Sequence, residues 1–465
     1  MTPTPSPSPV PASTATPVED KLRSALRLVG RGLRWFFSNR GFQSIPVTKD
    51  IDRHPMFRGG ISRGTWRFFM LRLTPASRWF LLPTVIFMTY GSSSLQLQAY
   101  VPFCYALGLW ATGFLGVLFC KPRVKLRISH AERIREGETL PIDIEIEQLR
   151  SLSAAELNVI PYGLPPDMDA ESDEGISVPS LAVGETARLR LNLLCKKRGN
   201  QRWKGYRVST DFPFGLISAY RIFASAHPLL VHPNYTPLAR MEIPIGRRYQ
   251  PGGVALASKL GESFEFLGDR EFRHGDNIRD IDWRATARLN QPIVREYREE
   301  YFQRVAVVLD THLPRGAKSR RMEDFERGIS ICAAVSDFMS RQDYIVDLFA
   351  AGPDLYHLTS GRSLAYLEQI LDILACVEPT PLEPFDILEP EIQENLAQIT
   401  AVICIFLDWN EARRDFVHNL SREGTGLKIV IVRDGPCTLD PNADAVLGPI
   451  PVISAERFAA GVEEF

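Results

Sequence analysis

The sequence predicts two transmembrane helices, then an antiparallel β-sandwich-like module, and finally a doubly wound α/β domain built on a parallel sheet. Three observations predict this order. An uncharged run of 42 residues comes first, short segments of alternating polarity follow it, and apolar strands that alternate with helical segments end the chain. A length of 465 residues provides for several cores, because single domains usually hold about 100–200 residues.

The charge and cysteine content exclude several classes of protein. Lys and Arg number 54 against 55 Asp and Glu, so the net charge of −1 gives no bulk attraction for nucleic acid, and we expect no nucleic-acid partner. The seven cysteines are scattered, with no Cys-x-x-Cys motif and no histidine at metal-ligand spacing. This pattern indicates reduced thiols in a reducing compartment and no disulfide framework.

The N-terminal part divides into two segments. Residues 1–20 are rich in Pro, Ser and Thr without an apolar run, which predicts a disordered tail. Residues 21–78 form a basic region that begins with Leu22, Leu26 and Leu33 on one face of an amphipathic helix. This helix is expected either to lie on a membrane surface or to pack on the body of the protein.

Residues 79–120 are predicted to cross a membrane twice. The 42 uncharged residues would form roughly 63 Å of helix, twice the apolar thickness of a bilayer, and the Gly/Ser/Gln-rich stretch 91–98 predicts the turn between two spans. The alternative is a buried hairpin of a soluble protein.

The flanks of this region predict its orientation. Both flanks are basic, and no Asp or Glu occurs between Asp52 and Glu132. Under the positive-inside rule both flanks face the cytoplasm. We therefore expect a multi-pass protein of the inner (plasma) membrane, with two helices and with both termini and the soluble domains in the cytoplasm.

Residues 121–242 alternate between polar and apolar side chains in short segments that are separated by turn signals about every ten residues. This pattern predicts the β-sandwich-like module. The stretch 209–221 places Phe and Pro before a Gly, which predicts a buried turn at the end of a strand.

Residues 301–465 contain apolar segments such as "RVAVVLD" and "ITAVICIFLD" in alternation with helical ones, which predicts a parallel sheet covered on both faces. Ligands of such sheets bind at the carboxyl ends of the strands, where Asp310, Asp408 and Asp434 are expected. Three carboxylates at one edge can hold a hard cation, or they can cap the following helices and loops.

The segment 243–300 contains "REFRHGDNIRDIDWRATARLNQPIVREYREE" at residues 270–300. It resembles the signature of the domain-of-unknown-function family 58, whose members combine it with a von Willebrand factor A-like domain. The "KRG" and "FPFGL" stretches and the α/β end are also similar, so the resemblance covers about 75–465. The candidate interface residues of the signature are Arg270, Glu271, Gly275, Asp276, Arg279, Asp282, Trp283, Arg284, Arg288 and Arg295.

The resemblance implies a membrane-anchored protein that works with a MoxR-type AAA ATPase and with other membrane or envelope proteins. Its A-like domain would be a module for protein interaction or assembly, and we expect no enzymatic activity. The alternative is a metal-dependent or hydrolytic activity at the carboxyl edge of the α/β sheet.

Many A-like domains bind a metal ion through Asp-x-Ser-x-Ser after the first strand. Here the motif begins with Asp310 and Thr311, but His312 and Pro314 replace the two serines. Proline offers no side-chain ligand and histidine offers a softer nitrogen. We therefore expect a degenerate adhesion site of Asp310, Thr311 and Asp408, and no cofactor apart from weakly bound Mg²⁺.

Catalysis by the signature segment is not expected, because it shows no Ser or Cys nucleophile beside a base. Phosphate binding is disfavoured as well, since 7 Arg stand against 8 Asp and Glu in residues 268–300. Two hypotheses remain. The segment is a joint that Arg–carboxylate pairs lock around a buried Trp283, or it is a docking surface, since Arg and Trp dominate the energetics of protein interfaces.

Overall fold

The computed structural model describes residues 47–50, 64, 68–93, 97–149, 156–179, 181–224, 228–244, 264–274, 276, 278–299, 304–342, 344–351, 355–360, 364–396, 398–443 and 447–462. The predicted tail and the predicted amphipathic helix lie outside these residues. The chain divides into two compact units, Met1–Val231 and His232–Phe465.

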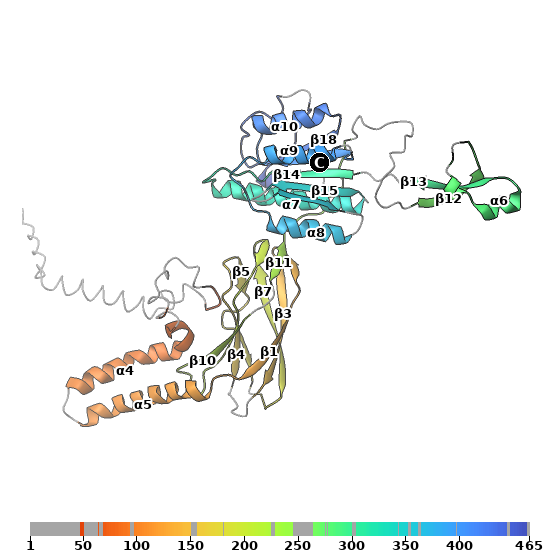
Figure 1. Cartoon of the computed structure of the whole chain (residues 1–465). Coiled ribbons are helices and arrows are strands. Elements are labelled where there is room, and N and C mark those ends of the chain that lie inside the picture. Colours follow the sequence, from red (N-terminus) through yellow and green to blue (C-terminus); the bar gives the residue numbers. More distant parts are fainter. Residues whose placement is uncertain are drawn as a thin grey trace, which may run out of the picture. The chain divides into compact units, whose positions relative to one another are not determined.

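The first unit contains two long helices. A π-helical turn, η3 (Phe68–Arg72), precedes α4 (Pro75–Ser93) and α5 (Leu97–Phe119), which lie side by side (Figure 1). The indole Nε1 of Trp110 donates a hydrogen bond to Thr84 Oγ1 at 3.2 Å and so ties the helices together. Within the described residues, α5 alone is long and apolar enough to cross a membrane, over Tyr100–Phe119.

The described strands of the first unit form three sheets. The first is antiparallel, in the order β1 (Val124–Ser129), β3 (Thr139–Gln148), β7 (Thr186–Cys195) and β5 (Met168–Ala170). The second is also antiparallel, in the order β10 (Ala219–Ala224), β9 (Gly205–Thr210), β4 (Leu157–Tyr162) and β6 (Ile176–Val178). The third has the order β2 (Arg133–Arg135), β11 (Leu229–His232) and β8 (Gly199–Gln201).

Alternation along the strands builds the core of this unit. In β3, Ile142 and Ile144 are buried while Asp143 between them is exposed, because successive side chains of a strand point to opposite faces. The buried side chains of β3 join those of β4 and β9, such as Val159 and Val208, in one hydrophobic cluster. The first two sheets therefore share a core.

The second unit is built on a six-stranded sheet. Its order is β16 (Leu355–Ser360), β15 (Ile345–Ala351), β14 (Arg304–Leu309), β17 (Ala401–Phe406), β18 (Gly426–Val432) and β19 (Val452–Ile453). The helices are α7 (Ser319–Arg341), α8 (Leu364–Cys376), α9 (Phe385–Asn395), α10 (Glu411–Arg422) and α11 (Ala455–Ala459) (Figure 1).

Helices cover both faces of this sheet. Val305 and Val307 of β14 pack in a cluster with α7 and α8, whereas Ala306 and Val308 pack in a second cluster with α9 and α10. Both alternating sets are buried, so the strand is apolar throughout. The predicted run of alternating strands and helices is therefore present as a mixed α/β unit.

Four described elements of the α/β part, β16, α9, β19 and α11, were not predicted. β16 pairs antiparallel with β15 at the edge, so the sheet is not wholly parallel. α9 was missed because its sequence, "FDILEPEIQEN", contains Pro390 and a proline precedes it. Its buried Phe385, Leu388 and Ile392 compensate for the lost backbone donor.

The described part of 243–300 forms a small separate sheet. β12 (Phe264–Glu271) pairs antiparallel with β13 (Ile293–Glu299). Between the strands lie the 3₁₀-helical turn η4 (Ile278–Asp280) and the short helix α6 (Trp283–Leu289). We call residues 264–299 the signature hairpin.

The core of the second unit provides a test of its packing. Phe325 of α7 is fully buried among the β14 and α8 side chains, so Phe325→Ala should lower the free energy of unfolding by about 3–5 kcal/mol. Met322 on the same helix is 43% exposed, and Met322→Ala is the matched control with little effect. Chemical denaturation of the detergent-solubilised chain, followed by circular dichroism, measures both. Equal losses for the two variants would contradict the packing described here.

Candidate functional site

The signature hairpin is held by paired charges. The guanidinium of Arg270 binds both oxygens of Asp276, at 2.7 and 2.8 Å. The backbone N–H of Arg273 donates to the same carboxylate at 2.7 Å. Together, and with Arg270 contributing most, these donors lower the pKa of Asp276 to about 2. The pair therefore fixes the chain after β12.

A second carboxylate organises the helix of the hairpin. Asp282 is the N-cap of α6 and accepts hydrogen bonds from the backbone N–H groups of Arg284 and Ala285, at 2.9 and 3.0 Å. Its other oxygen accepts from Arg295 of β13, at 3.0 and 3.1 Å. The pKa of Asp282 is lowered by these donors, first of all by the Ala285 N–H. Asp282 thus joins α6 to the sheet.

Three large apolar side chains of the hairpin are exposed. Trp283 is 67% exposed, Ile278 is 68% exposed and Leu289 is 52% exposed. The prediction that a locked joint buries Trp283 is therefore wrong. The physical reason is the length of α6, which has 7 residues and buries Ala285 alone.

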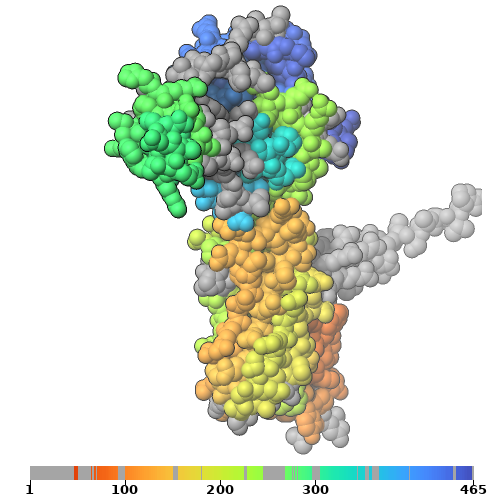
Figure 2. All heavy atoms as spheres, turned by 90° about the vertical axis from the view of Figure 1, so that its right-hand side faces the viewer, coloured from red at the N-terminus to blue at the C-terminus, as the bar shows by residue number. Residues whose placement is uncertain are grey.

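Basic groups lie on the same helix. Arg284 and Arg288 are exposed, and α6 contains no acidic residue. Among the described residues, neither of these guanidinium groups pairs with a carboxylate. Figure 2 shows the hairpin as a compact green group of atoms. The hairpin therefore combines a fixed backbone with an exposed surface of apolar and basic side chains, which we call the Trp283 surface (Ile278, Trp283, Arg284, Arg288 and Leu289).

The remaining predicted residues of the signature have smaller parts. Glu271 accepts a hydrogen bond from Gln291 at 3.3 Å, and Arg279 is exposed on η4. Gly275 lies outside the described residues. Sequence reasoning identified the charged pairs as a class but did not assign which arginine binds which aspartate.

The carboxyl edge of the six-stranded sheet is a second candidate site. Asp310 follows β14 and is fully buried. Its Oδ1 accepts from the His312 N–H at 2.9 Å, and its Oδ2 accepts from the Leu407 N–H at 2.9 Å. Oδ2 also binds Nε and Nη2 of Arg413 at 2.8 and 2.6 Å. A guanidinium cation thus neutralises the carboxylate on which a metal site of the adhesion type would depend.

Asp408, after β17, is satisfied in the same way. Oδ1 accepts from the N–H groups of Trp409 and Thr438, at 2.8 and 2.9 Å. Oδ2 accepts from the Thr438 hydroxyl at 2.8 Å and forms an ion pair with Arg433. Burial raises the pKa of Asp408, but the hydrogen bonds from Thr438 and Arg433 outweigh it, so the pKa is lowered overall. Nη2 of Arg321 also lies 3.6 Å from Oδ2 of Asp408.

The third carboxylate, Asp434, lies beside the first turns of α7. It pairs with Arg320 at 2.8 Å, and its backbone N–H donates to Asp324 at 3.1 Å. Asp324 is buried and also binds Arg327 at 2.7 Å, while burial raises its pKa. Each acid of the edge therefore has an arginine as its counter-ion.

These residues do not fit a metal ion. Thr311 is fully buried, and its carbonyl accepts from the Thr380 N–H at 2.8 Å. Within the described residues, no group of three or more His, Cys, Asp or Glu side chains is placed to hold a metal. The arginines, which sequence reasoning missed, take the place of a cation at Asp310 and Asp408.

One signal in the sequence could have revealed Arg413. The buried positions of α10 are Arg413, Phe416, Val417 and Leu420, which repeat at the spacing of an apolar helical face. A charged residue on such a face requires a buried partner of opposite charge. Asp310 is that partner.

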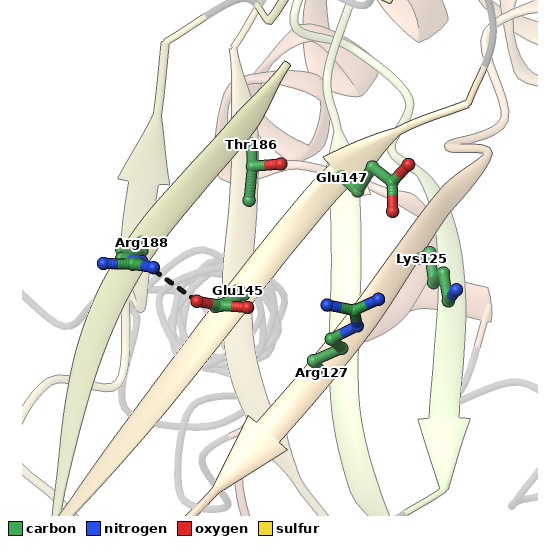
Figure 3. Close-up of a pocket in the computed structure, with 6 residues that line it drawn as sticks. All are labelled: Lys125, Arg127, Glu145, Glu147, Thr186 and Arg188. Atoms are coloured by element: carbon green, nitrogen blue, oxygen red, sulfur yellow. Dashed lines mark hydrogen bonds and ion pairs between the residues drawn. The ribbon is translucent and has the colours of Figure 1, made fainter. Parts of the chain in front are cut away.

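A shallow hollow lies on the outer face of β1, β3 and β7, lined by Lys125, Arg127, Glu145, Glu147, Thr186 and Arg188 (Figure 3). Lys125 lies opposite Glu147, and Arg188 pairs with Glu145 at 2.9 Å. Opposite charges across neighbouring strands stabilise an exposed sheet face. This face, orange and yellow in Figure 2, is a solvated surface and does not indicate a ligand site.

Part of the chain matches a known protein family. Residues 268–433 match a family described as protein of unknown function DUF58, which confirms the resemblance that the signature suggested. The uncharacterized protein YeaD of Bacillus subtilis (strain 168) is 24% identical over 140 residues, which are 30% of this chain and 32% of that relative. Most of the length of that relative is therefore not aligned.

Two structural similarities are to α2-macroglobulin of Escherichia coli. The fragment from domain MG7 to the C-terminus has a TM-score of 0.20 and 18% identity, and the match covers 25% of this chain and 17% of that chain. The native protein has a TM-score of 0.18 and 16% identity, with 24% and 7% covered. Scores this low do not indicate a common fold.

Removal of Asp310 tests the buried pair at the sheet edge. Asp310→Ala leaves the Arg413 guanidinium buried without its counter-ion, so the free energy of unfolding should fall by about 3–5 kcal/mol. Asp415→Ala on α10, where the carboxylate is 68% exposed, should cost less than about 1 kcal/mol. Mg²⁺ or a chelator should leave the unfolding midpoint of the parent chain unchanged. An unfolding midpoint that rises with Mg²⁺ would contradict the conclusion that the Arg413 guanidinium takes the place of a cation at Asp310.

The Arg270–Asp276 pair predicts a pH dependence. The pKa of Asp276 is about 2 in the folded chain and about 4 when unfolded. This carboxylate therefore stabilises the hairpin above pH ~4, and the stabilisation is lost as the pH falls toward ~2. Arg270→Gln should raise the pKa of Asp276 toward its ordinary value while leaving the Arg190-paired Asp143 unchanged. Carbon-13 NMR titration of labelled aspartate carboxyls measures both, and an unmoved Asp276 would refute the assignment.

Proposed function

We propose that this chain, whose residues 268–433 match the protein of unknown function DUF58, is a membrane-anchored, non-enzymatic protein-interaction or assembly factor. In this proposal it works with a MoxR-type AAA ATPase and with other membrane or envelope proteins. The Trp283 surface is the observation that carries the proposal, because exposed Trp and Arg side chains on a fixed backbone are typical of interface hot spots.

The two candidate sites differ in what they offer a partner. At the carboxyl edge, the buried Asp310 and the nearly buried Asp408 already bind internal donors. In the signature hairpin the charged pairs are also satisfied, but the Trp283 surface beside them is exposed. This contrast favours docking through the hairpin over metal-dependent or hydrolytic activity at the sheet edge.

Membrane anchoring is part of the same proposal. The apolar span Tyr100–Phe119 of α5 supports it. We propose that α4 is a second span and that both termini and the soluble units are cytoplasmic, on the basis of the basic flanks and the absence of acidic residues near them. The membrane is then the inner (plasma) membrane.

The proposal also includes a fold for each of the two soluble parts of the chain. We infer that residues 121–231 of the predicted module 121–242 form a β-sandwich, on the basis of the core that the two antiparallel sheets share. We infer that residues 301–465 form a von Willebrand factor A-like domain, on the basis of a largely parallel sheet with helices on both faces. The signature hairpin within 243–300 would present the docking surface.

Substitution of the exposed tryptophan tests docking. Trp283→Ala should weaken binding to the AAA ATPase by about 2 kcal/mol, or roughly 30-fold in Kd, since buried aromatic anchors dominate interfaces. Arg288→Ala should also weaken it. Neither variant should change thermal unfolding, because both side chains are exposed. Co-purification from membranes and titration with the isolated ATPase measure these effects.

The matched control is Leu382→Ala, which removes a side chain that is 68% exposed outside the hairpin and should leave binding unchanged. A fall in the melting temperature of Trp283→Ala with normal ATPase binding would replace docking by a structural lock. Unchanged stability and unchanged binding would refute both hypotheses.

A further inference from the structure

The loop between β9 and β10 is hydrogen-bonded to the residues that directly precede α4. Leu73 forms a β-bridge with Ile217. On either side of it, the Ser218 N–H donates to the Arg72 carbonyl at 2.7 Å and the Thr74 N–H donates to the Leu216 carbonyl at 3.3 Å. The residues that lead into α4 therefore pair with this loop as a short strand.

A buried arginine strengthens the attachment. Arg207 of β9 is 6% exposed, and its Nη2 donates to the Leu71 carbonyl at 2.8 Å and to Ser218 Oγ at 3.0 Å. Its guanidinium also lies over the ring of Tyr220, 5.1 Å from the centroid. A buried guanidinium is stabilised only by its hydrogen bonds and its contact with an aromatic ring. Arg207 therefore holds the residues before α4 and the loop in one arrangement.

The same loop packs closely on the end of α5. A Cβ atom at Gly116 would lie 2.8 Å from Pro213 Cδ, and one at Gly113 would lie 3.3 Å from Ile217 Cδ1. Two glycines, one turn apart, thus permit the loop to touch the helix backbone. Leu216 and Ile217 complete the contact in a small cluster with Trp110.

Two aromatic side chains of this loop are nevertheless exposed. Phe212 is 44% exposed and Phe214 is 54% exposed, so the predicted buried turn at residues 209–221 is wrong for these rings. Both belong to the loop that packs on Gly113 and Gly116, and in the same turns of α5 Leu115 and Leu118 are 55% and 74% exposed. The exposed apolar groups of the loop and of the helix therefore lie at the same level along the axis of α5.

The depth of this region follows from helix geometry. Gly116 precedes the last residue of α5, Phe119, by three positions, which is about 4.5 Å along the axis. Lys121 and Arg123 follow immediately, and Arg72 and Arg78 flank the start of α4. If α5 crosses a membrane, the loop lies where acyl chains meet headgroups, with basic groups around it.

The geometry points to a lipid-binding loop: residues 211–218 dip into the membrane interface, with Phe212 and Phe214 in contact with the lipid. This inference rests on the proposed membrane insertion of α5. The occupant is a lipid bilayer, because the exposed rings belong to a loop packed on the last turns of the apolar span, next to the flanking basic groups. The β-sheet unit is then held against the membrane by its own loop as well as by the helices.

Depth-dependent quenching tests this contact on the full chain in bilayer nanodiscs. In a background with Cys104, Cys120, Cys376 and Cys437 replaced by Ser, the buried Cys195, Cys332 and Cys404 remain unreactive. Single cysteines labelled with a fluorescent probe then replace one of three residues. These are Phe214, Leu107 in the middle of α5, and Arg188 on the exposed face of the sheet formed by β1, β3, β7 and β5. Lipids that carry a nitroxide at the headgroup or deep in the acyl chain serve as quenchers.

The inference expects the Phe214→Cys probe to be quenched most by the headgroup nitroxide, the Leu107→Cys probe most by the deep nitroxide, and the Arg188→Cys probe by neither. Quenching at Leu107 without quenching at Phe214 would overturn the lipid contact and leave the membrane span intact; a soluble partner would then be the occupant of the loop. No quenching at Leu107 would overturn the span and the loop contact together.

A pair of glycine substitutions provides the matched control. Gly116→Leu inserts a side chain where Pro213 lies and should displace the loop, which reduces quenching of the Phe214→Cys probe. Gly108→Leu lies on the same helix with nothing within 4 Å of its Cβ position and should leave that quenching unchanged. Equal quenching in the two variants would contradict a loop position set by α5.

Discussion

The buried ion pair between Asp310 and Arg413 connects three elements of the second unit. Asp310 follows β14, Arg413 belongs to α10, and the Leu407 N–H that binds the same carboxylate follows β17. Two charges without water are stable only when each satisfies the other. The pair therefore aligns the central strands with the helix that covers them, and it uses the donors and acceptors that a ligand at this edge would need.

The signature hairpin is also held by ion pairs between arginine and aspartate. Its pairs Arg270–Asp276 and Arg295–Asp282 lie near the surface and fix a small sheet that has little core of its own. The helix α6 has 7 residues and buries only Ala285, and its Trp283 is 67% exposed. The pairs hold the backbone of the segment while Trp283 is exposed, so the lock hypothesis concerns the backbone and the docking hypothesis concerns the side chains of one element.

Much of the fold was predictable because its signal is local. Strands such as β3 and β14 are recognisable from alternation or from continuous apolar character, and α7 and α10 from helical spacing. α9 was not predicted, since its prolines suppress the helical signal and only burial of Phe385, Leu388 and Ile392 against the sheet stabilises it. β16 was missed because an edge strand depends on its neighbour β15 for its hydrogen bonds.

The sequence by itself determined the order of the structural classes, the apolar span, the arginine–aspartate signature and the absence of an Asp-x-Ser-x-Ser pattern at Asp310, since each depends on residue type and spacing alone. Only the tertiary structure decided that Arg413 pairs with Asp310, 103 positions away in the chain, and that Trp283 is exposed. It also decided that the loop of residues 211–218 packs on Gly116. The physical reason is the same in each case. Burial and ion pairing join residues that are distant in the chain, and local patterns do not specify which of several partners a side chain meets.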